Sequence, residues 1–315
     1  MRSGARRGTA VAPGHVPSGV APSTVLVTGA GGMIGRTVLD QLDTLGVAAV
    51  ALVPEDPGDL RAARVVVGDA GDPSAVRDAV RDVDAVIHLA ALASPHHDTA
   101  DQVFTRNTRA TFVVLEEAGA AGVRRAVIAG SYGITGLPWA AGYLAPSYLP
   151  VDERLPLQIE DAYGLSKQVD EATAAMMHRR HAMTVLSLRF PFVGHGERLD
   201  ARVEQGVRDP GALAADVWAY LHTADAARAC WLGLTAVTSG FHAVFLAAPD
   251  TSVPYPTAEL VAAFHPGVEL RTPFPGRTCP IDVSAAAALL GFRAEHVLGF
   301  AERPLVEAEA ARQGS

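Results

Sequence analysis

The chain has 315 residues, of which 49% are hydrophobic and 19% charged, and its formal net charge is −8 at pH 7. This composition is typical of a soluble globular protein with one large domain and room for a smaller lobe. The acidic balance argues against nucleic acid as a partner, because phosphate backbones bind basic surfaces. No apolar run reaches the roughly 18 residues of a membrane span.

The N-terminal residues and the cysteines exclude further classes. Residues 1–22 are rich in Gly, Pro, Ala and Arg but lack the continuous apolar segment of a signal peptide, so we expect a disordered extension. Cys230 and Cys279 lie far apart and match no metal-ligand spacing. Two isolated cysteines indicate a reducing compartment, and we expect a cytoplasmic protein without disulfides.

From Ser23 onward, short apolar runs alternate with helical segments. Continuous apolar runs, rather than alternating ones, indicate a parallel sheet covered on both faces. We therefore predict an α/β fold with a Rossmann-type doubly wound parallel sheet. The predicted strands are TVLV from Thr24, VAAVALV (47–53), ARVVVGD (63–69), VDAVIHLAA (83–91), RRAVIAGS (124–131) and MTVLSLRF (183–190). One predicted helix ends at Gly46, and the next has Asp72 as its N-cap. Two longer helices are predicted over about 101–121 and 161–180.

The alternation is lost past residue 190. The segment 191–215 has the composition of a loop, and 217–237 indicates a short strand and a helix that returns to the main sheet. Later segments are predicted to be smaller elements of a second lobe; they are HAVFLAA (242–248), PTAELVAAFHP (256–266) and DVSAAAALLGF (282–292). We expect a dinucleotide-binding domain over residues 23–190, to which about 216–238 return. Residues 191–315 are expected to form mainly a substrate-binding lobe and the C-terminal tail.

The turn TGAGGMIG follows the first predicted strand and opens a helix. Gly29 permits the tight turn, Gly32 lets the backbone approach a pyrophosphate, and Gly35 lets helix and strand pack closely. The free N–H groups of the helix N-terminus then face the phosphates. The motif predicts a dinucleotide site.

The residues after the second strand bear on the choice between NAD and NADP. Glu55 and Asp56 would repel a 2′-phosphate, which favours NAD, although Arg36 and Arg61 leave NADP open. Asp69, after the third strand, either contacts the adenine amino group or caps the following loop.

Lys167 is the only lysine of the chain and lies four residues after Tyr163 on a predicted helix. The two side chains therefore share one face. A tyrosine is ordinarily a poor base near neutral pH, and a nearby cation favours its phenolate. A compact ammonium can also bond both hydroxyls of a ribose, which the broad guanidinium fork cannot. Ser131 ends a buried strand at the edge where parallel sheets bind ligands. An inconsequential surface pair remains the alternative for Tyr163 and Lys167.

At this point the chain resembles the extended short-chain dehydrogenase/reductase superfamily, in its NAD-dependent epimerase/dehydratase group. The resemblance covers about residues 24–300 and rests on ordered motifs, among them TGAGGMIG, GDAGD, DAVIHLAA, NTRAT, VDERLPL, YGLSKQVDE, LRFPF and YLHTADAARA. It implies an NAD(P) cofactor and a homodimer formed through the helices near 107–122 and 163–180. It also implies catalysis by Ser131, Tyr163 and Lys167, with Tyr163 as general acid/base. The implied cofactor residues are Gly29, Gly32, Met33, Ile34, Gly35, Asp69, Ala70, Leu89, Ala90, Ala91, Asn107, Tyr163, Lys167 and Pro191.

Departures from the family pattern narrow the chemistry. Tyr132 and Gly133 stand where the related dehydratases carry an Asp-Glu pair, which argues against dehydratase and decarboxylase reactions. Phe192 stands near the sequence position at which the nucleotide-sugar enzymes carry an asparagine. Trp218 and Ala219 stand where those enzymes carry a basic residue. These changes argue against a nucleoside-diphosphate sugar. The candidate substrate residues are Ser131, Tyr132, Trp139, Phe192, His195 and Arg277.

Two segments keep alternative interpretations. Trp139, Tyr143 and Tyr148 either line a pocket for an uncharged or ring-containing substrate, or pack a long loop onto the body. The run from His96 to Asp98 is read as a solvated loop, and no metal is expected.

Three functions remain open at this point. The first is an NAD(P)-dependent oxidoreductase acting on a secondary alcohol or ketone of a sugar-like or secondary-metabolite substrate. The second is a sugar epimerase with retained NAD, and the third is a non-catalytic dinucleotide-sensing protein.

Overall fold

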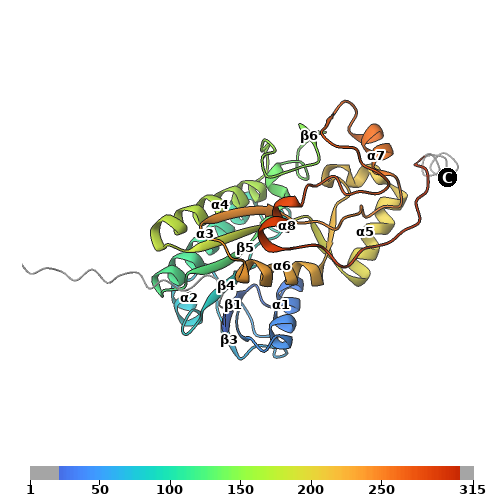
Figure 1. Ribbon diagram of the computed structural model, residues 1–315. Helices are drawn as coiled ribbons and strands as arrows, with labels where there is room; N and C mark the ends of the chain where they lie inside the picture. The colour runs from blue at the N-terminus through green and yellow to red at the C-terminus, as the bar shows by residue number, and fades with distance from the viewer. Residues whose placement is uncertain (1–20, 306–315) are drawn as a thin grey trace, which may run out of the picture.

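The computed structural model describes residues 21–305, and its centre is a seven-stranded parallel sheet (Figure 1). The strand order is β10-β7-β5-β4-β1-β2-β3. The predicted doubly wound α/β fold is confirmed. The predicted extension lies almost wholly outside the described residues. The strands of this sheet are β1 (Thr24–Thr28), β2 (Ala48–Val53), β3 (Arg64–Val67), β4 (Ala85–His88), β5 (Arg125–Ser131), β7 (Thr184–Phe190) and β10 (Phe241–Phe245).

Helices cover both faces of the sheet because successive strand residues point to opposite sides. Val25 and Val27 of β1 enter one core, which they share with α1 and α6. Leu26 enters the other core, together with residues of α2, α3 and α4. The first face is covered by α1 (Met33–Thr44), α6 (Thr223–Thr235) and α8 (Ser284–Leu290), and the second by α2 (Pro73–Ala79), α3 (Ala100–Ala120) and α4 (Ala162–His181).

The order of strands reverses between β1 and β4, and this creates the crevice in which doubly wound folds bind ligands. Gly29, directly after β1, has a φ of 65° and touches the backbone that follows β4. A Cβ atom at Gly29 would lie 2.7 Å from the amide nitrogen of Ala90. Only glycine therefore allows the two strand ends to approach this closely.

A second lobe lies beyond the carboxyl ends of β5 and β7, where α5, α7 and β6 group together in Figure 1. Its separate apolar core contains Trp218, Tyr255 and Phe274. Two small parallel sheets, β8 with β9 and β11 with β6, join its segments. The remaining elements are η1 (Tyr132–Thr135), β6 (Tyr148–Leu149), β8 (Phe192–Gly194), α5 (Gly196–Arg208), η2 (Pro210–Asp216), β9 (Tyr220–His222), α7 (Thr257–Phe264) and β11 (Glu269–Leu270).

Three expectations for the second half of the chain are wrong. The segment 191–215 is not a loop, because it contains β8, α5 and η2. Its helix was missed because charged and polar residues dominate α5, although Leu199, Val203 and Val207 recur at the four-residue spacing of one helix face. The run 242–248 forms β10, an edge strand of the main sheet, and α8 packs into the core of that sheet, so neither belongs to the second lobe.

Replacing Gly35 by alanine tests the tight packing of the glycine turn. The new Cβ would lie 2.7 Å from Cα of Ala30 and would also collide with the carbonyl oxygen of Gly29. We expect the free energy of unfolding to fall by about 1–3 kcal/mol, because the backbone has to move. Urea unfolding measures this change.

Gly31→Ala is the matched control in the same turn, because its nearest neighbour, Val53, lies at an ordinary 3.7 Å. We expect this variant to stay within about 0.5 kcal/mol of the parent. Equal losses in the two variants would contradict the packing argument.

Candidate active site

A single large cavity of about 980 Å³ follows the carboxyl edge of the sheet. It lies at the upper end of the size range of small-molecule and cofactor pockets. The predicted cofactor residues and Ser131 all line it; from the amino-terminal half these are Gly29, Gly32, Met33, Ile34, Gly35, Asp69, Ala70, Leu89, Ala90, Ala91 and Asn107, followed by Ser131, Tyr163, Lys167 and Pro191. The structure therefore brings together residues that are more than 160 positions apart in the chain.

The glycine turn is shaped for a dinucleotide. Gly32 is the N-cap of α1, and no side chain caps its free N–H groups or adds an acidic charge to the first turn. A Cβ at Gly32 would lie 3.3 Å from the carbonyl oxygen of Gly29, so the open cradle depends on glycine. Bare helix N–H groups beside a cradle without side chains are the arrangement that binds a pyrophosphate. The residues present fit NAD(P).

The arginines that could have held a 2′-phosphate are engaged elsewhere. Arg36 forms two hydrogen bonds to Asp59, at 2.8 and 3.1 Å, and Arg61 pairs with Asp40 at 3.3 Å. Neither arginine lines the cavity. Asp69 does line it, while its Oδ1 accepts a hydrogen bond from the amide of Gly71. Both roles considered for Asp69 thus have a structural basis.

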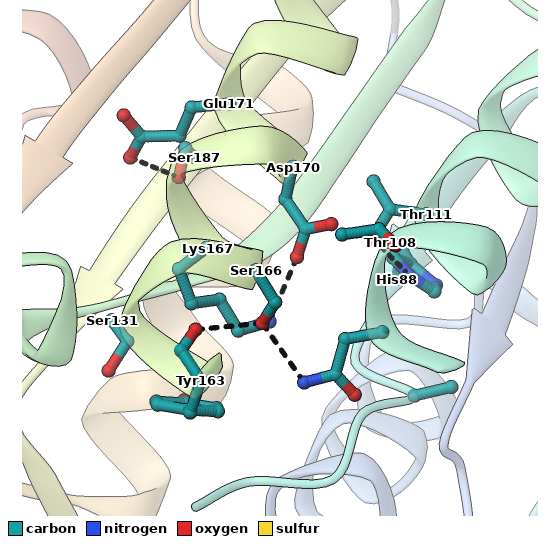
Figure 2. A network of polar contacts seen from close by, with 12 residues as sticks. His88, Thr108, Thr111, Ser131, Tyr163, Ser166, Lys167, Asp170, Glu171 and Ser187 are labelled. Atoms are coloured by element: carbon teal, nitrogen blue, oxygen red, sulfur yellow. Dashed lines mark hydrogen bonds and ion pairs between the residues drawn. The ribbon is translucent and has the colours of Figure 1, made fainter. Parts of the chain in front are cut away.

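Tyr163 and Lys167 share one face of α4, as Figure 2 shows, and Ser131 lies at the end of the neighbouring β5. The Lys167 Nζ is 5.6 Å from the centre of the Tyr163 ring. Gly133 explains how these groups converge. A Cβ there would lie 3.1 Å from Ser131 Oγ, 3.1 Å from Tyr163 Cε1 and 3.2 Å from Trp139 Nε1.

Asn107 fixes α4 to the loop after β4. Its side chain donates to Leu92 O at 3.1 Å and accepts from Leu92 N at 2.8 Å. It also donates to Ser166 Oγ at 3.1 Å, and Ser166 in turn donates to the carbonyl oxygen of Tyr163 at 2.7 Å (Figure 2). This chain of hydrogen bonds holds the backbone that carries Tyr163 in position.

Lys167 is buried, and its ammonium group pairs with Asp170 Oδ2 at 3.2 Å (Figure 2). Burial lowers the pKa of Lys167, but the carboxylate of Asp170 and the surrounding negative groups outweigh this effect. The pKa of Lys167 therefore lies above its ordinary value. A protonated amine is thus available at neutral pH in the wall of the cavity.

His88, beneath this site, is a packed core residue. Its ring nitrogens contact the hydroxyl groups of Thr28 at 2.7 Å and Thr111 at 3.2 Å. Burial, assisted by the positive charge of Lys167, lowers the pKa of His88 to about 3. The ring is therefore neutral, and it does not compete with Lys167 for negative partners.

The predicted substrate residues divide into two groups. Tyr132, Trp139 and Phe192 line the cavity with Ser131. His195 does not; it is exposed and its Nδ1 lies 3.0 Å from the Thr223 hydroxyl. Arg277 is also outside, because it is buried against Asp250 at 2.6 Å. The structure therefore does not bring His195 and Arg277 together with the other candidate substrate residues.

The long loop before α4 contributes a single aromatic side chain to the cavity. Trp139 lines it, whereas Tyr143 is exposed and Tyr148 is buried in the second lobe, where it donates to Asp152 at 2.6 Å. The ring of His96 packs edge-on against Trp139 at 5.4 Å.

Across residues 21–305, no three His, Cys, Asp or Glu side chains are grouped as metal ligands. No helix in this part of the chain has the length and apolar character to cross a membrane.

Sequence reasoning missed Asp170 beside Lys167, and it missed Arg198, Arg202 and Asp216 on the cavity wall. Asp170 lies three positions after Lys167, and that spacing on a predicted helix was the signal that could have revealed the ion pair. Arg198 and Arg202 line the cavity from α5. They were missed because α5 itself was read as a loop.

Comparison with known proteins identifies the family. The model of the NAD dependent epimerase/dehydratase family matches residues 25–246. The chain therefore belongs to this family, whose cofactor is NAD(P).

Two curated relatives carry different activities. A putative UDP-glucose 4-epimerase of Methanocaldococcus jannaschii is 31% identical over 58% of this chain and 60% of its own length. An L-arabinose 1-dehydrogenase (NAD(P)(+)) of Haloferax volcanii is 28% identical over 58% of this chain and 71% of its own length. The first of these alignments spans less than two thirds of the relative.

A solved structure matches over more of the chain. A short-chain dehydrogenase/reductase superfamily protein of Agrobacterium tumefaciens with bound NAD is 26% identical, with a TM-score of 0.66. The match covers 92% of this chain and 97% of that protein.

Asp170→Asn tests the buried ion pair. It leaves the ammonium of Lys167 buried without its partner, and we expect a loss of about 3 kcal/mol in the free energy of unfolding at pH 7. The pKa of Lys167 is raised in the folded state. The ion pair therefore stabilises the folded state at pH values below the ordinary pKa of lysine, and this stabilisation is lost as pH rises through the raised pKa. Chemical denaturation at pH 7 measures the loss.

Asp78→Asn is the matched control, because Asp78 at the end of α2 forms an exposed pair with Arg81, which is also three residues further along the chain. We expect it to change stability by less than about 1 kcal/mol. A loss as large as that of Asp170→Asn would show that burial of the pair is not what matters.

Proposed function

We propose that this member of the NAD-dependent epimerase/dehydratase family is a dehydrogenase of a sugar-like secondary alcohol. The observation that carries the proposal is the placement of Ser131, Tyr163 and Lys167 in one cavity with the glycine turn. When bound, NAD would accept a hydride from the alcohol carbon. The absence of an acid at Tyr132 and Gly133 supports simple oxidation rather than elimination of water.

Each polar residue has a defined task in this proposal. The Ser131 hydroxyl orients the substrate oxygen, and its acceptance of the Gly133 amide at 2.9 Å leaves its own proton free to donate. Tyr163 acts as a phenolate, which the nearby ammonium of Lys167 stabilises, and it becomes a neutral phenol when it takes the hydroxyl proton of the alcohol. Lys167 also offers donors to the ribose, while Asn107 and Ser166 keep Tyr163 in place. Gly29, Gly32 and Gly35 hold the pyrophosphate. The engaged Arg36 and Arg61 support NAD over NADP.

Tyr163→Phe tests the proton transfer. Wild-type protein should form free NADH from at least one sugar of a panel containing L-arabinose, D-glucose, D-glucose 6-phosphate and D-glucuronate. We expect Tyr163→Phe to reduce kcat about 10²- to 10⁴-fold, because the acid/base group is lost. NAD binding, measured by calorimetry, should change far less than kcat, because the glycine turn that holds the pyrophosphate is untouched. Tyr143→Phe removes an exposed hydroxyl outside the cavity and should keep full activity.

A sugar epimerase that retains NAD is the second candidate, favoured by the similarity to the UDP-glucose 4-epimerase relative. Acid denaturation followed by chromatography separates the two. Near-stoichiometric NAD released from purified protein, without free NADH during turnover, would replace the dehydrogenase by the epimerase. Unchanged turnover in Tyr163→Phe would favour the dinucleotide-sensing alternative.

We also infer a homodimer formed through α3 and α4, which pack side by side (Figure 1). Phe112 on α3 and Leu165 on α4 leave 46% and 42% of their surface exposed, and a partner subunit packed on these helices would cover them. Light scattering should give a dimer mass, and Phe112→Glu should lower it. Leu45→Glu, at an equally exposed leucine after α1, is the control. A monomer mass for the parent would contradict the proposal.

A further inference from the structure

One end of the cavity, beyond β7, is lined by two arginines of α5. Arg198 and Arg202 are four residues apart, and the Cζ atoms of their guanidinium groups lie 4.8 and 4.4 Å from the centre of the Phe192 ring. Like charges at this spacing on a helix destabilise it, so the arrangement needs a compensating partner. Phe192, which departs from the family pattern, serves here as the platform on which both arginines rest.

Arg202 is buried, yet its hydrogen bonds are incomplete. Its Nη2 donates to Asp216 at 2.9 Å and to the carbonyl oxygen of Ala219 at 3.1 Å. Its Nε has no partner although it is shielded from solvent. The buried Arg189 differs, because Glu171 accepts from its Nε and Nη2 at 2.9 and 2.8 Å. An unsatisfied donor on a buried cation is costly, and such a group calls for an acceptor.

The unsatisfied donors of the described residues collect around this cavity. Of the five buried polar side-chain atoms without partners, three belong to lining residues: Tyr132 Oη, Trp139 Nε1 and Arg202 Nε. The indole and guanidinium nitrogens can only donate. Arg198 adds more donors at the mouth of the cavity, since only its Nε is engaged, with Val193 O at 3.0 Å. A ligand rich in acceptor oxygens would complement this wall.

The balance of charge selects among such ligands. At the α5 end of the cavity, Arg198 and Arg202 lie with one carboxylate, Asp216, while the exposed Glu197 lines only a shallow outer depression. A single negative charge matches the surplus, and a planar carboxylate matches the guanidinium fork. A phosphate monoester carries close to two negative charges and would meet Asp216 with the second.

We propose that the substrate carries a carboxylate that binds at Arg198 and Arg202, so that the substrate is a sugar acid or a similar hydroxy acid. This inference rests on the proposed function for its reacting end, where Ser131 and Tyr163 meet the alcohol. The carboxylate end is defined independently by α5, Phe192 and Asp216. Trp139, whose Nε1 lies beside Gly133 at the reacting end, would donate to a further oxygen of the substrate.

Calorimetry on the Tyr163→Phe variant with NAD present measures sugar binding without turnover. The probes are D-glucuronate, D-glucose 6-phosphate and D-glucose. We expect D-glucuronate to bind at least about 10-fold more tightly than D-glucose, as charge-assisted hydrogen bonds allow. Adding Arg198→Gln, which changes an exposed residue, should weaken D-glucuronate about 10- to 100-fold and leave D-glucose unchanged.

Further variants sharpen the assignment. Arg198→Lys should retain part of the affinity for D-glucuronate, because the charge stays but the fork is lost. Asp216→Asn should improve binding of D-glucose 6-phosphate more than that of D-glucuronate. Arg179→Gln removes an exposed arginine of α4 outside the cavity and should change nothing.

The outcomes separate this inference from the proposed function. Tighter binding of D-glucose 6-phosphate than of D-glucuronate would overturn the carboxylate. Absent D-glucuronate binding, or binding that ignores Arg198→Gln, would overturn the anion site even if NADH forms from D-glucose. Binding of D-glucuronate that depends on Arg198, with no NADH formed by wild type, would uphold the site and reject the dehydrogenase.

Discussion

The contact between Gly29 and the backbone of Leu89 and Ala90 is the constraint on which the site depends. It joins the ends of β1 and β4 at the point where the strand order reverses. Because parallel strands end at the same edge, closing this contact places the glycine turn beside the loop after β4. Asn107 then holds that loop at Leu92, and through Ser166 it also holds the backbone of Tyr163. The glycine turn and the candidate acid/base Tyr163 are thus connected by short-range contacts.

The single lysine meets a demand that arginine would not meet. Lys167 is buried between α3, α4 and the cavity, where an ammonium needs one close counter-charge and leaves donors for a ligand. Asp170 supplies the counter-charge from the next turn of the same helix. His88 remains neutral beneath it because burial and the positive charge both depress its pKa. The positive charge near Tyr163 is therefore concentrated on one group whose protonation is secured by its surroundings.

The first half of the fold could be predicted because its signals are local. The strands of the main sheet from β1 to β7 are continuous apolar runs. At the start of α2, Asp72 precedes Pro73, and the side chain of Asp72 accepts a hydrogen bond from the amide of Ser74. Past residue 190 the deciding contacts are long-range. Phe192 to Gly194 pair with a strand some 28 residues later, and β10 becomes part of the main sheet only through its pairing with β7. No periodicity marks such pairings.

The same distinction separates the site residues that were found from those that were missed. Tyr163 and Lys167 are visible as a spacing on one helix, whereas Arg277 looked available until its partner Asp250 was seen across the second lobe. Arg202 is the reverse case, a residue in an apparent loop that the structure buries with incomplete hydrogen bonding. Whether a charged side chain is free to bind is a property of its neighbours, and it becomes visible only when those neighbours are placed.

The departures from the family pattern form one consistent arrangement. An acidic side chain at Gly133 would crowd Ser131, Tyr163 and Trp139, whose atoms lie 3.1–3.2 Å from the position of its missing Cβ. The indole N–H of Trp139, a donor, lies at this position instead. At the far end, Phe192 supports two guanidinium groups in place of an amide. Both substitutions shift the cavity wall from groups that accept or exchange protons to groups that donate hydrogen bonds. In the proposed function, a wall of this kind holds the substrate by its oxygen atoms and leaves proton transfer to Tyr163.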